Sequence, residues 1–449
     1  MQIGFGKVDI TPRVGVELCG FGPHLHRYSV GVRDRLEARA MAVREGNITL
    51  VLISCDLVGF PLALTREIRR QIHAATGISA DQVMVHGTHT HSGPNTIPEL
   101  AGWGALDEPY LAILPGRVAS AGIEAVSHLE PATLAWAEVP CIGVSLNREY
   151  DRDAPPLEEV LREDWRPAKP EHVDTTCQVL KAVAKDGRLL GFASYFGCHP
   201  VVCCQQTRWI HGDFAGVASH LIERENPGAV GLFLQGALGD INSCVVHKPE
   251  AESLAALDVI AERYARAVRA GLAAARPVAP GPLGAIRREL SFSRIQVSRA
   301  ELERLLAEQE AVFTAPGASD TDDAVRMAAV KVAAYRKILA AQTRGENLNP
   351  PTELQGFRIG PVSLLGTPFE IFHAVKEEAL TRLKSEHPLI LGLSNDELGY
   401  APDRATAIRG GYAAQQVPLM LGRLPFAAIH DELVSALVDL GGALSQARK

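Results

Sequence analysis

Residues 83–94 read Val-Met-Val-His-Gly-Thr-His-Thr-His-Ser-Gly-Pro, and the fold and the site both follow from this stretch. The apolar run at 83–85 predicts the end of a buried strand, which Gly93-Pro94 then stops. Residues two apart in an extended segment project to the same face, so His89 and His91 are expected to point together. Neutral imidazole is the commonest protein ligand for zinc, so the pair indicates two metal ligands, or one ligand beside a proton carrier. Because His-x-His also occurs by chance, the motif needs support from the rest of the chain.

Composition limits the classes of protein to consider. The chain has 449 residues, of which 47% are hydrophobic and 22% charged, and its net charge is −7. These values are typical of a globular protein and argue against nucleic-acid binding. The N-terminus lacks the basic and apolar regions of a secretory signal, and no apolar run is long enough for a membrane span. We therefore expect a cytoplasmic protein without a stable membrane span, whose eight dispersed cysteines are reduced and buried.

The pattern of apolar runs predicts an α/β fold with a large mixed β-sheet core, surrounding helices and an inserted helical hairpin. Strand pairs are expected at 36–56 and 175–195, where short turn sequences separate β-branched runs. The charged segment 299–343 predicts the helical hairpin, and its charge favours a solvated surface over a lid or a dimer arm. We expect one domain over 1–449 with a helical insertion at 299–350, and we leave homo-oligomerisation open.

Further candidate ligands follow three other predicted strands. His199 lies before a proline, Glu370 precedes a predicted helix, and Tyr400 ends a polar loop. These residues are far apart in the chain, so they indicate a site assembled by the fold, as catalytic zinc sites are, and not a local zinc finger. Each also has a structural explanation: a turn cap for His199, a helix cap for Glu370 and a core position for Tyr400.

The order of these motifs resembles the neutral/alkaline non-lysosomal ceramidases. The matching blocks are Gly-Lys-Val-Asp-Ile-Thr-Pro (6–12), Gly-Thr-His-Thr-His-Ser-Gly-Pro (87–94), Asn-Arg (147–148), Cys-His-Pro (198–200), Gly-Ala-Leu-Gly-Asp-Ile-Asn (236–242), Pro-Phe-Glu (368–370) and Gly-Leu-Ser-Asn-x4-Tyr (392–400). The resemblance extends from about residue 3 to about residue 415. The block at 87–94 is specific, and the others gain weight from their order.

The resemblance implies a zinc-dependent hydrolase that cleaves the amide (N-acyl) bond of a small-molecule acyl-amide substrate with metal-activated water. Four residues would bind the zinc ion: His89, His199, Glu370 and Tyr400. His91 would contact the reacting amide and deliver a proton to the leaving amine. Arg148 and Tyr412 would line the amide site, where either could stabilise the oxyanion.

The chain departs from that family at one catalytic block. The family carries Gly-Asp-x-Ser, with the serine implicated in catalysis, whereas this chain has Asp240 followed by Asn242 and Ser243. Asp240 and Asn242 remain candidate catalytic residues, and Asn242 argues against a serine-dependent step. The family also has an immunoglobulin-like C-terminal domain and is secreted or membrane-associated. The absence of both features here predicts a smaller or more polar substrate than ceramide.

Two alternatives remain. A metal-dependent amidohydrolase of the (β/α)8 type also uses a His-x-His strand, but the predicted hairpins do not match eight βα repeats. A zinc-binding or lipid-binding relative that has lost catalysis is the other alternative, and Asn242 supports it.

Overall fold

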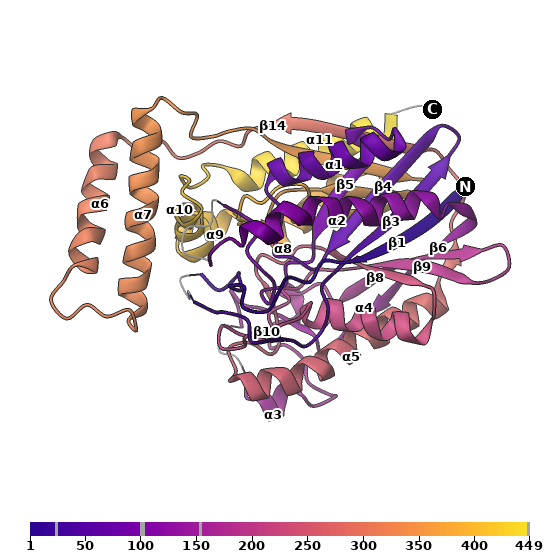
Figure 1. The fold of residues 1–449 in the computed structure, drawn as a ribbon, viewed down its shortest axis with the longest axis horizontal. Helices are drawn as coiled ribbons and strands as arrows, with labels where there is room; N and C mark the ends of the chain where they lie inside the picture. The colour runs from indigo at the N-terminus through magenta and orange to yellow at the C-terminus, as the bar shows by residue number, and fades with distance from the viewer. Residues whose placement is uncertain (23–25, 99–103, 152–154, 447–449) are drawn as a thin grey trace.

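The computed structural model describes residues 1–22, 26–98, 104–151 and 155–446, and most of its strands form two sheets (Figure 1). The larger sheet has the spatial order β11 (Val230–Gln235), β9 (Leu189–Phe196), β8 (Thr176–Ala184), β6 (Glu130–Pro140), β1 (Gln2–Asp9), β3 (Glu37–Glu45), β4 (Ile48–Cys55), β5 (Val83–Gly87), with β13 (Arg276–Pro277) beside β6. The smaller sheet has the order β14 (Leu283–Leu290), β15 (Thr352–Ile359), β16 (Val362–Gly366), β18 (His387–Leu391). Pairs β4/β5, β9/β11 and β16/β18 are parallel, and the other pairs within these sheets are antiparallel.

The two sheets bury an apolar core between them. Phe5, Leu52 and Leu232 from the larger sheet belong to the same buried cluster as Phe357 and Leu364 from the smaller one. Helices pack on the outer faces: α1 (Leu62–Thr76), α2 (Glu108–Ser127), α4 (Asp213–Glu225), α5 (Glu250–Ala274), α8 (His373–Arg382) and α11 (Ile429–Gln446). This arrangement confirms the predicted α/β class with a mixed sheet. It excludes the (β/α)8 alternative, because antiparallel hairpins form much of the larger sheet.

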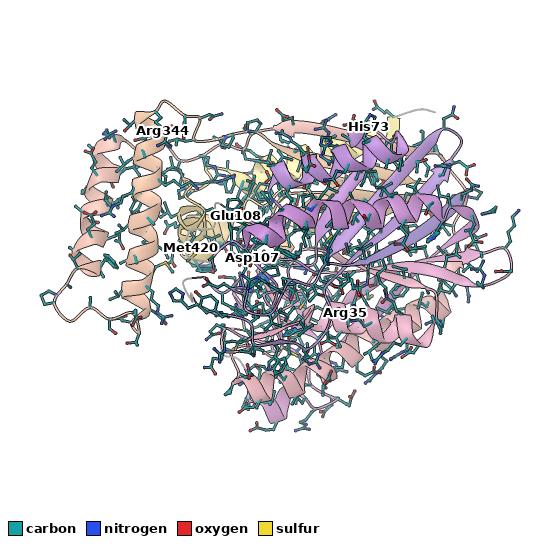
Figure 2. The ribbon with its side chains drawn as sticks, in the orientation of Figure 1. Arg35, His73, Asp107, Glu108, Arg344 and Met420 are labelled. Carbon is teal, nitrogen blue, oxygen red and sulfur yellow. The ribbon has the colours of Figure 1, made fainter. Side chains whose placement is uncertain are left out.

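The predicted helical hairpin is present and interrupts a pair of neighbouring strands. Strands β14 and β15 pair along their whole length, yet α6 (Arg299–Phe313) and α7 (Asp323–Thr343) lie between them in sequence. Ser298 and Asp322 cap the two helices by accepting backbone N–H bonds. The hairpin projects from the body in Figure 1, and Figure 2 shows Arg344 at the end of α7, where the chain turns back.

Short elements complete the structure around the ends of the parallel strands. Apart from β13, the two-residue and three-residue strands form three pairs: β2 (Gly31–Val32) with β10 (Trp209–Ile210), β7 (Ser145–Asn147) with β12 (Ile241–Ser243), and β17 (Glu370–Ile371) with β19 (Tyr400–Ala401). The short helices are α3 (Leu157–Val160), α9 (Arg404–Arg409), α10 (Val417–Met420), two 3-10 turns (Ala80–Gln82 and Pro170–His172) and a π-helical turn (Tyr412–Gln416). In α/β folds, ligand sites form where parallel strands end.

All eight cysteines are buried and none forms a disulfide, as the sequence predicted. Among the described helices, none combines the length and the apolar character that a bilayer span requires.

Candidate metal centre

His89 and His91 come together at the end of β5, as predicted, but for a different geometric reason. The strand stops at Gly87, and the backbone N–H of His89 donates to the carbonyl of Leu57, 2.9 Å away, so the chain crosses the end of β4. His89 has φ +72°, a left-handed conformation that side-chain-bearing residues seldom adopt. The ring centroids of the two histidines are 4.8 Å apart. A tight turn, and not alternation along a strand, therefore brings the imidazoles together.

Gln235, at the end of β11, joins the two histidine-bearing segments. Its side-chain amide donates to the carbonyls of Thr88 and Cys198, both at 2.9 Å, and its Oε1 accepts the N–H of Cys198. Gln235 is fully buried, so these bonds are not exchanged with water. The residues that follow these carbonyls are His89 and His199. One side chain thus fixes the relative position of two predicted metal ligands.

The other two predicted ligands are neighbours across a short parallel pair. Glu370 of β17 lies opposite Tyr400 of β19 in register. His199 forms an isolated parallel bridge with Asn242, which places the β12 turn beside it. The rings of His199 and Tyr400 have their centroids 6.2 Å apart. The fold therefore gathers His89, His199, Glu370 and Tyr400 from four separate segments.

The histidine nitrogens are arranged as they are in metal sites. Nδ1 of His89 donates to the carbonyl of Val58, and Nδ1 of His199 donates to the carbonyl of Leu238, each at 2.6 Å. A carbonyl can only accept, so the proton of each neutral ring is on Nδ1 and the lone pair is on Nε2. Both Nε2 atoms face Oε2 of Glu370, at 3.4 Å and 2.9 Å. Facing acceptors repel one another unless a cation lies among them, so this donor set fits a metal ion.

Burial and charge together set the protonation of these groups. Burial lowers the pKa of His199 to about 4, which keeps the ring neutral and able to ligate. Burial raises the pKa of Tyr400 strongly, against the opposing effect of Arg148. Arg148 is thus the residue that favours an ionised, ligating Tyr400.

His91 differs from its two neighbours. Both of its ring nitrogens are buried and neither has a hydrogen-bond partner among the described residues. Phe21 packs edge-on against the ring, with centroids 4.8 Å apart, and burial lowers the pKa of His91 well below its usual value. His91 also lies close enough to His89 and His199 for the three rings to share an ion. It lacks the Nδ1 anchor that the other two possess, which suits a group that faces substrate.

A cavity of about 290 Å³ opens onto these residues. Its lining includes all four predicted ligands together with His91, Arg148, Asn242 and Tyr412. Arg148 donates to the carbonyl of Gly239 at 2.6 Å and reaches Oδ1 of Asn242 at 3.5 Å. Its guanidinium carbon lies 5.2 Å from the centroid of the Tyr400 ring. The cavity therefore places a fixed cation and an amide opposite the histidine cluster.

Asp240 lies behind the cavity and does not line it. One carboxylate oxygen accepts the N–H of His373 at 2.7 Å, and the other accepts from Asn147 at 2.8 Å. The backbone carbonyl of Asp240 also accepts the N–H of Arg148 at 2.9 Å. Both side-chain oxygens are thus occupied. This placement gives Asp240 a positioning role towards Arg148, in place of the catalytic role expected from the sequence.

A second group of metal-ligating residue types lies nearby but is unsuited to a metal. Cys203, His211 and Asp213 are buried and close together. The backbone N–H of Asp213 donates to Nδ1 of His211 at 3.0 Å, so the neutral ring carries its proton on Nε2, and that nitrogen has no lone pair for a metal. The carboxylate of Asp213 accepts backbone N–H groups, including that of Phe214. These contacts assign the group to stabilising the start of α4.

Several residues of the cavity wall belong to no motif that could be recognised in the sequence. These residues are Gly20, Phe21, Gly22, Val201, Gln205, Val246 and His247. They come from loops without catalytic motifs, and only the tertiary fold shows that the 20–22 loop covers His91. The Gly-x-Gly pattern at 20–22 indicates a close backbone approach but not what the backbone approaches.

Replacing Gly20 with alanine tests how this loop holds His91. Gly20 has φ +117°, and a Cβ atom there would lie 2.4 Å from Cγ of His91, so the ring must move. A displacement of about 1 Å can lower activity on the order of a hundredfold, and we expect a loss of that size with bound metal unchanged. Gly187→Ala is the matched control, because Gly187 has φ +91° but nothing within 4 Å. Equal kcat in wild type and Gly20→Ala would show that the loop does not position His91.

The fold and the donor set define an α/β protein with a buried candidate metal centre at the ends of its parallel strands. Residues 1–302 match the family model of the neutral/alkaline non-lysosomal ceramidase N-terminal region. The chain therefore belongs to the neutral/alkaline non-lysosomal ceramidase family, and the resemblance inferred from the motifs is confirmed.

Individual relatives show the extent of the similarity. The neutral ceramidase of Drosophila pseudoobscura pseudoobscura is 25% identical over 260 residues, which cover 54% of this chain and 36% of that protein. The neutral ceramidase of Pseudomonas aeruginosa is 28% identical over 262 residues, covering 55% and 38%. The crystal structure of the P. aeruginosa enzyme superposes with a TM-score of 0.76 at 19% identity, covering 99% of this chain and 74% of that one. The matched region thus spans little more than a third of these curated relatives, and the structural likeness supports the predicted fold.

Proposed function

We propose that this protein is a zinc-dependent hydrolase that cleaves an amide (N-acyl) bond of a small acyl-amide. The observation that supports this best is the convergence of two Nε2 lone pairs on one oxygen of Glu370, inside a cavity that also holds His91 and Arg148. Family membership supports the amide as the bond cleaved. His89, His199, Glu370 and Tyr400 would hold the ion. A bound Zn²⁺ supplies Lewis acidity, polarising a carbonyl and lowering the pKa of water towards neutrality.

The other cavity residues would stabilise the oxyanion and transfer a proton to the leaving nitrogen. Arg148 is held by Gly239 and Asn242, so its positive charge is fixed where negative charge would develop on the amide oxygen. Tyr412 lines the same cavity and can donate a hydrogen bond from its hydroxyl to that oxygen. Within the described parts of the chain neither ring nitrogen of His91 is hydrogen-bonded, so the ring can carry a proton to the departing nitrogen, which an amide needs because its anion leaves poorly.

The lining of the cavity supports water as the nucleophile. Among its described residues there is no serine, threonine, cysteine or lysine. Ser243, next to the position of the family serine, is fully buried, and its hydroxyl accepts the N–H of Val245. Asn242 faces the cavity, and its Oδ1 is turned towards Arg148, so its Nδ2 is left to donate to the substrate. We infer direct hydrolysis without an acyl-enzyme.

The size and chemistry of the cavity support a small or polar substrate. Its volume of about 290 Å³ is at the lower end of ligand pockets, which span roughly 300–1,000 Å³. Gln205 and His247 add polar groups to its wall. We propose that the bound portion is short and carries hydrogen-bonding groups near the amide.

A hydrolysis assay in H₂¹⁸O tests this proposal. We expect the purified, zinc-loaded protein to release the free acid from a panel of short N-acyl amides, with one ¹⁸O atom entering the acid in a single turnover. A chelator should stop the release, and added zinc should restore it. Zinc binding without turnover on any acyl-amide would instead support the relative that has lost catalysis. A burst of product followed by slower turnover would contradict the direct route.

A further inference from the structure

A second cavity lies away from the candidate metal centre, where the helical hairpin meets the body. Its volume is about 330 Å³, and its wall comes from α6, α7, the π-helical turn, α10 and the segments 295–297 and 424–425. Figure 1 shows α10 beside α7, and the two helices are in contact; Met420, at the end of α10, is labelled in Figure 2. We refer to this cavity as the hairpin groove. None of its lining residues lines the cavity of the metal centre.

The interior of the hairpin groove is apolar. Leu302, Leu419 and Leu424 are 9% exposed or less and belong to one buried cluster, against which Leu305 and Val297 pack. Ile295, also in the wall, is 47% exposed. Apolar side chains left partly open to water favour a ligand that covers them. An unbranched hydrocarbon chain fits a groove walled by leucines of α6 and α10 and by Leu424.

Three polar side chains at this groove have no partner within the described part of the chain. Lys331 and Tyr335 lie one turn apart on α7, and Gln416 lies opposite on the π-helical turn. The carboxylates of Glu301 and Glu308, near Tyr335, are both bonded to Arg304 and do not pair with Lys331. The groove therefore combines a hydrocarbon wall with an uncompensated ammonium and two neutral hydrogen-bond donors.

We propose that the hairpin groove binds a single-chain anionic amphiphile, namely a free fatty acid. The alkyl chain lies along Leu302, Leu305 and Leu419. The carboxylate pairs with Lys331 and accepts hydrogen bonds from the Tyr335 hydroxyl and the Gln416 amide. This site is distinct from the metal centre, and the inference does not depend on the proposed hydrolase activity.

Calorimetric titration with octanoate, decanoate and dodecanoate below micelle formation tests this site. We expect saturable one-to-one binding that tightens roughly tenfold for each added pair of methylenes until the groove is full. The titration is repeated with His89→Ala, because a zinc ion would also attract a carboxylate. Unchanged dodecanoate affinity in that variant places the ligand in the groove. Loss of binding in His89→Ala, or no saturable binding at all, would overturn the proposal.

Lys331→Met tests whether Lys331 binds the carboxylate of the fatty acid. Arg336→Met is the matched control on the same helix. Arg336 is exposed and pairs with Glu310, outside the groove. We expect dodecanoate to bind at least about tenfold more weakly to Lys331→Met and unchanged to Arg336→Met, whereas dodecanol should bind both equally. Tyr335→Phe should weaken dodecanoate without altering the fold. Equal dodecanoate affinity in wild type, Lys331→Met and Tyr335→Phe would show that these residues do not bind the carboxylate.

Discussion

His199→Ala is expected to lose bound zinc and, with it, at least about a thousandfold in the rate of amide hydrolysis. His199 supplies an Nε2 lone pair 2.9 Å from Glu370, and its Nδ1 is committed to Leu238, so no other atom of this segment can replace it. Elemental analysis of wild type and variant gives the metal content directly. Thermal unfolding gives a second readout, because zinc at about 100 times its Kd should stabilise the wild type by about 2.7 kcal/mol and leave the variant unchanged.

His211→Ala is the matched control for that experiment. His211 is also buried, and it belongs to the other group of metal-ligating residue types, with Cys203 and Asp213. Its Nδ1 accepts the N–H of Asp213, so the variant should lose stability but keep a full complement of zinc. If His199→Ala kept its full zinc content and His211→Ala lost the metal, the ion would belong to the group of Cys203, His211 and Asp213. That result would refute the proposed centre.

Much of this site could be predicted because its residues follow strand ends. His89, His199, Glu370 and Tyr400 each come after an apolar run that ends in turn residues, and the fold does bring these segments together. The order of these residues in the chain and their types were sufficient to predict them as candidate ligands. Alternation along a strand, which the sequence predicts, does not bring His89 and His91 together, because the left-handed turn at His89 depends on the Leu57 carbonyl at the end of a neighbouring strand.

Other features depend on contacts that no local pattern encodes. Gln235 joins the segments of His89 and His199 through buried bonds across more than one strand, yet in sequence it is only a polar residue after an apolar run. Asp240 was expected to act on substrate because it lies in a motif, whereas both of its oxygens are occupied by Asn147 and the backbone of His373. Motif membership showed that the residue matters but not which way its side chain faces.

His91→Ala is expected to keep its zinc and to lose turnover by roughly 10²–10⁴-fold, the usual contribution of a positioned acid or base. Anchoring of the ring nitrogens distinguishes His91 from His89 and His199. The Nδ1 atoms of His89 and His199 are fixed by carbonyls at 2.6 Å, as metal-ligating rings are, whereas neither nitrogen of His91 has a hydrogen-bond partner among the residues that the structure describes. The His91 ring packs against Phe21 beside the cavity, and no hydrogen bond from residues 1–22, 26–98, 104–151 or 155–446 orients it towards the ion, so it is suited to moving a proton.

Imidazole added to His91→Ala separates this role from a structural one. The variant leaves a space next to the metal centre, and free imidazole entering it can carry the proton that His91 no longer carries. We expect kcat to recover in proportion to imidazole concentration, while KM and zinc content stay at their wild-type values. His91→Gln, which retains hydrogen-bonding atoms but cannot carry a proton at neutral pH, should remain inactive. Loss of zinc in either variant would make His91 a ligand, because its ring does lie within reach of an ion shared with His89 and His199.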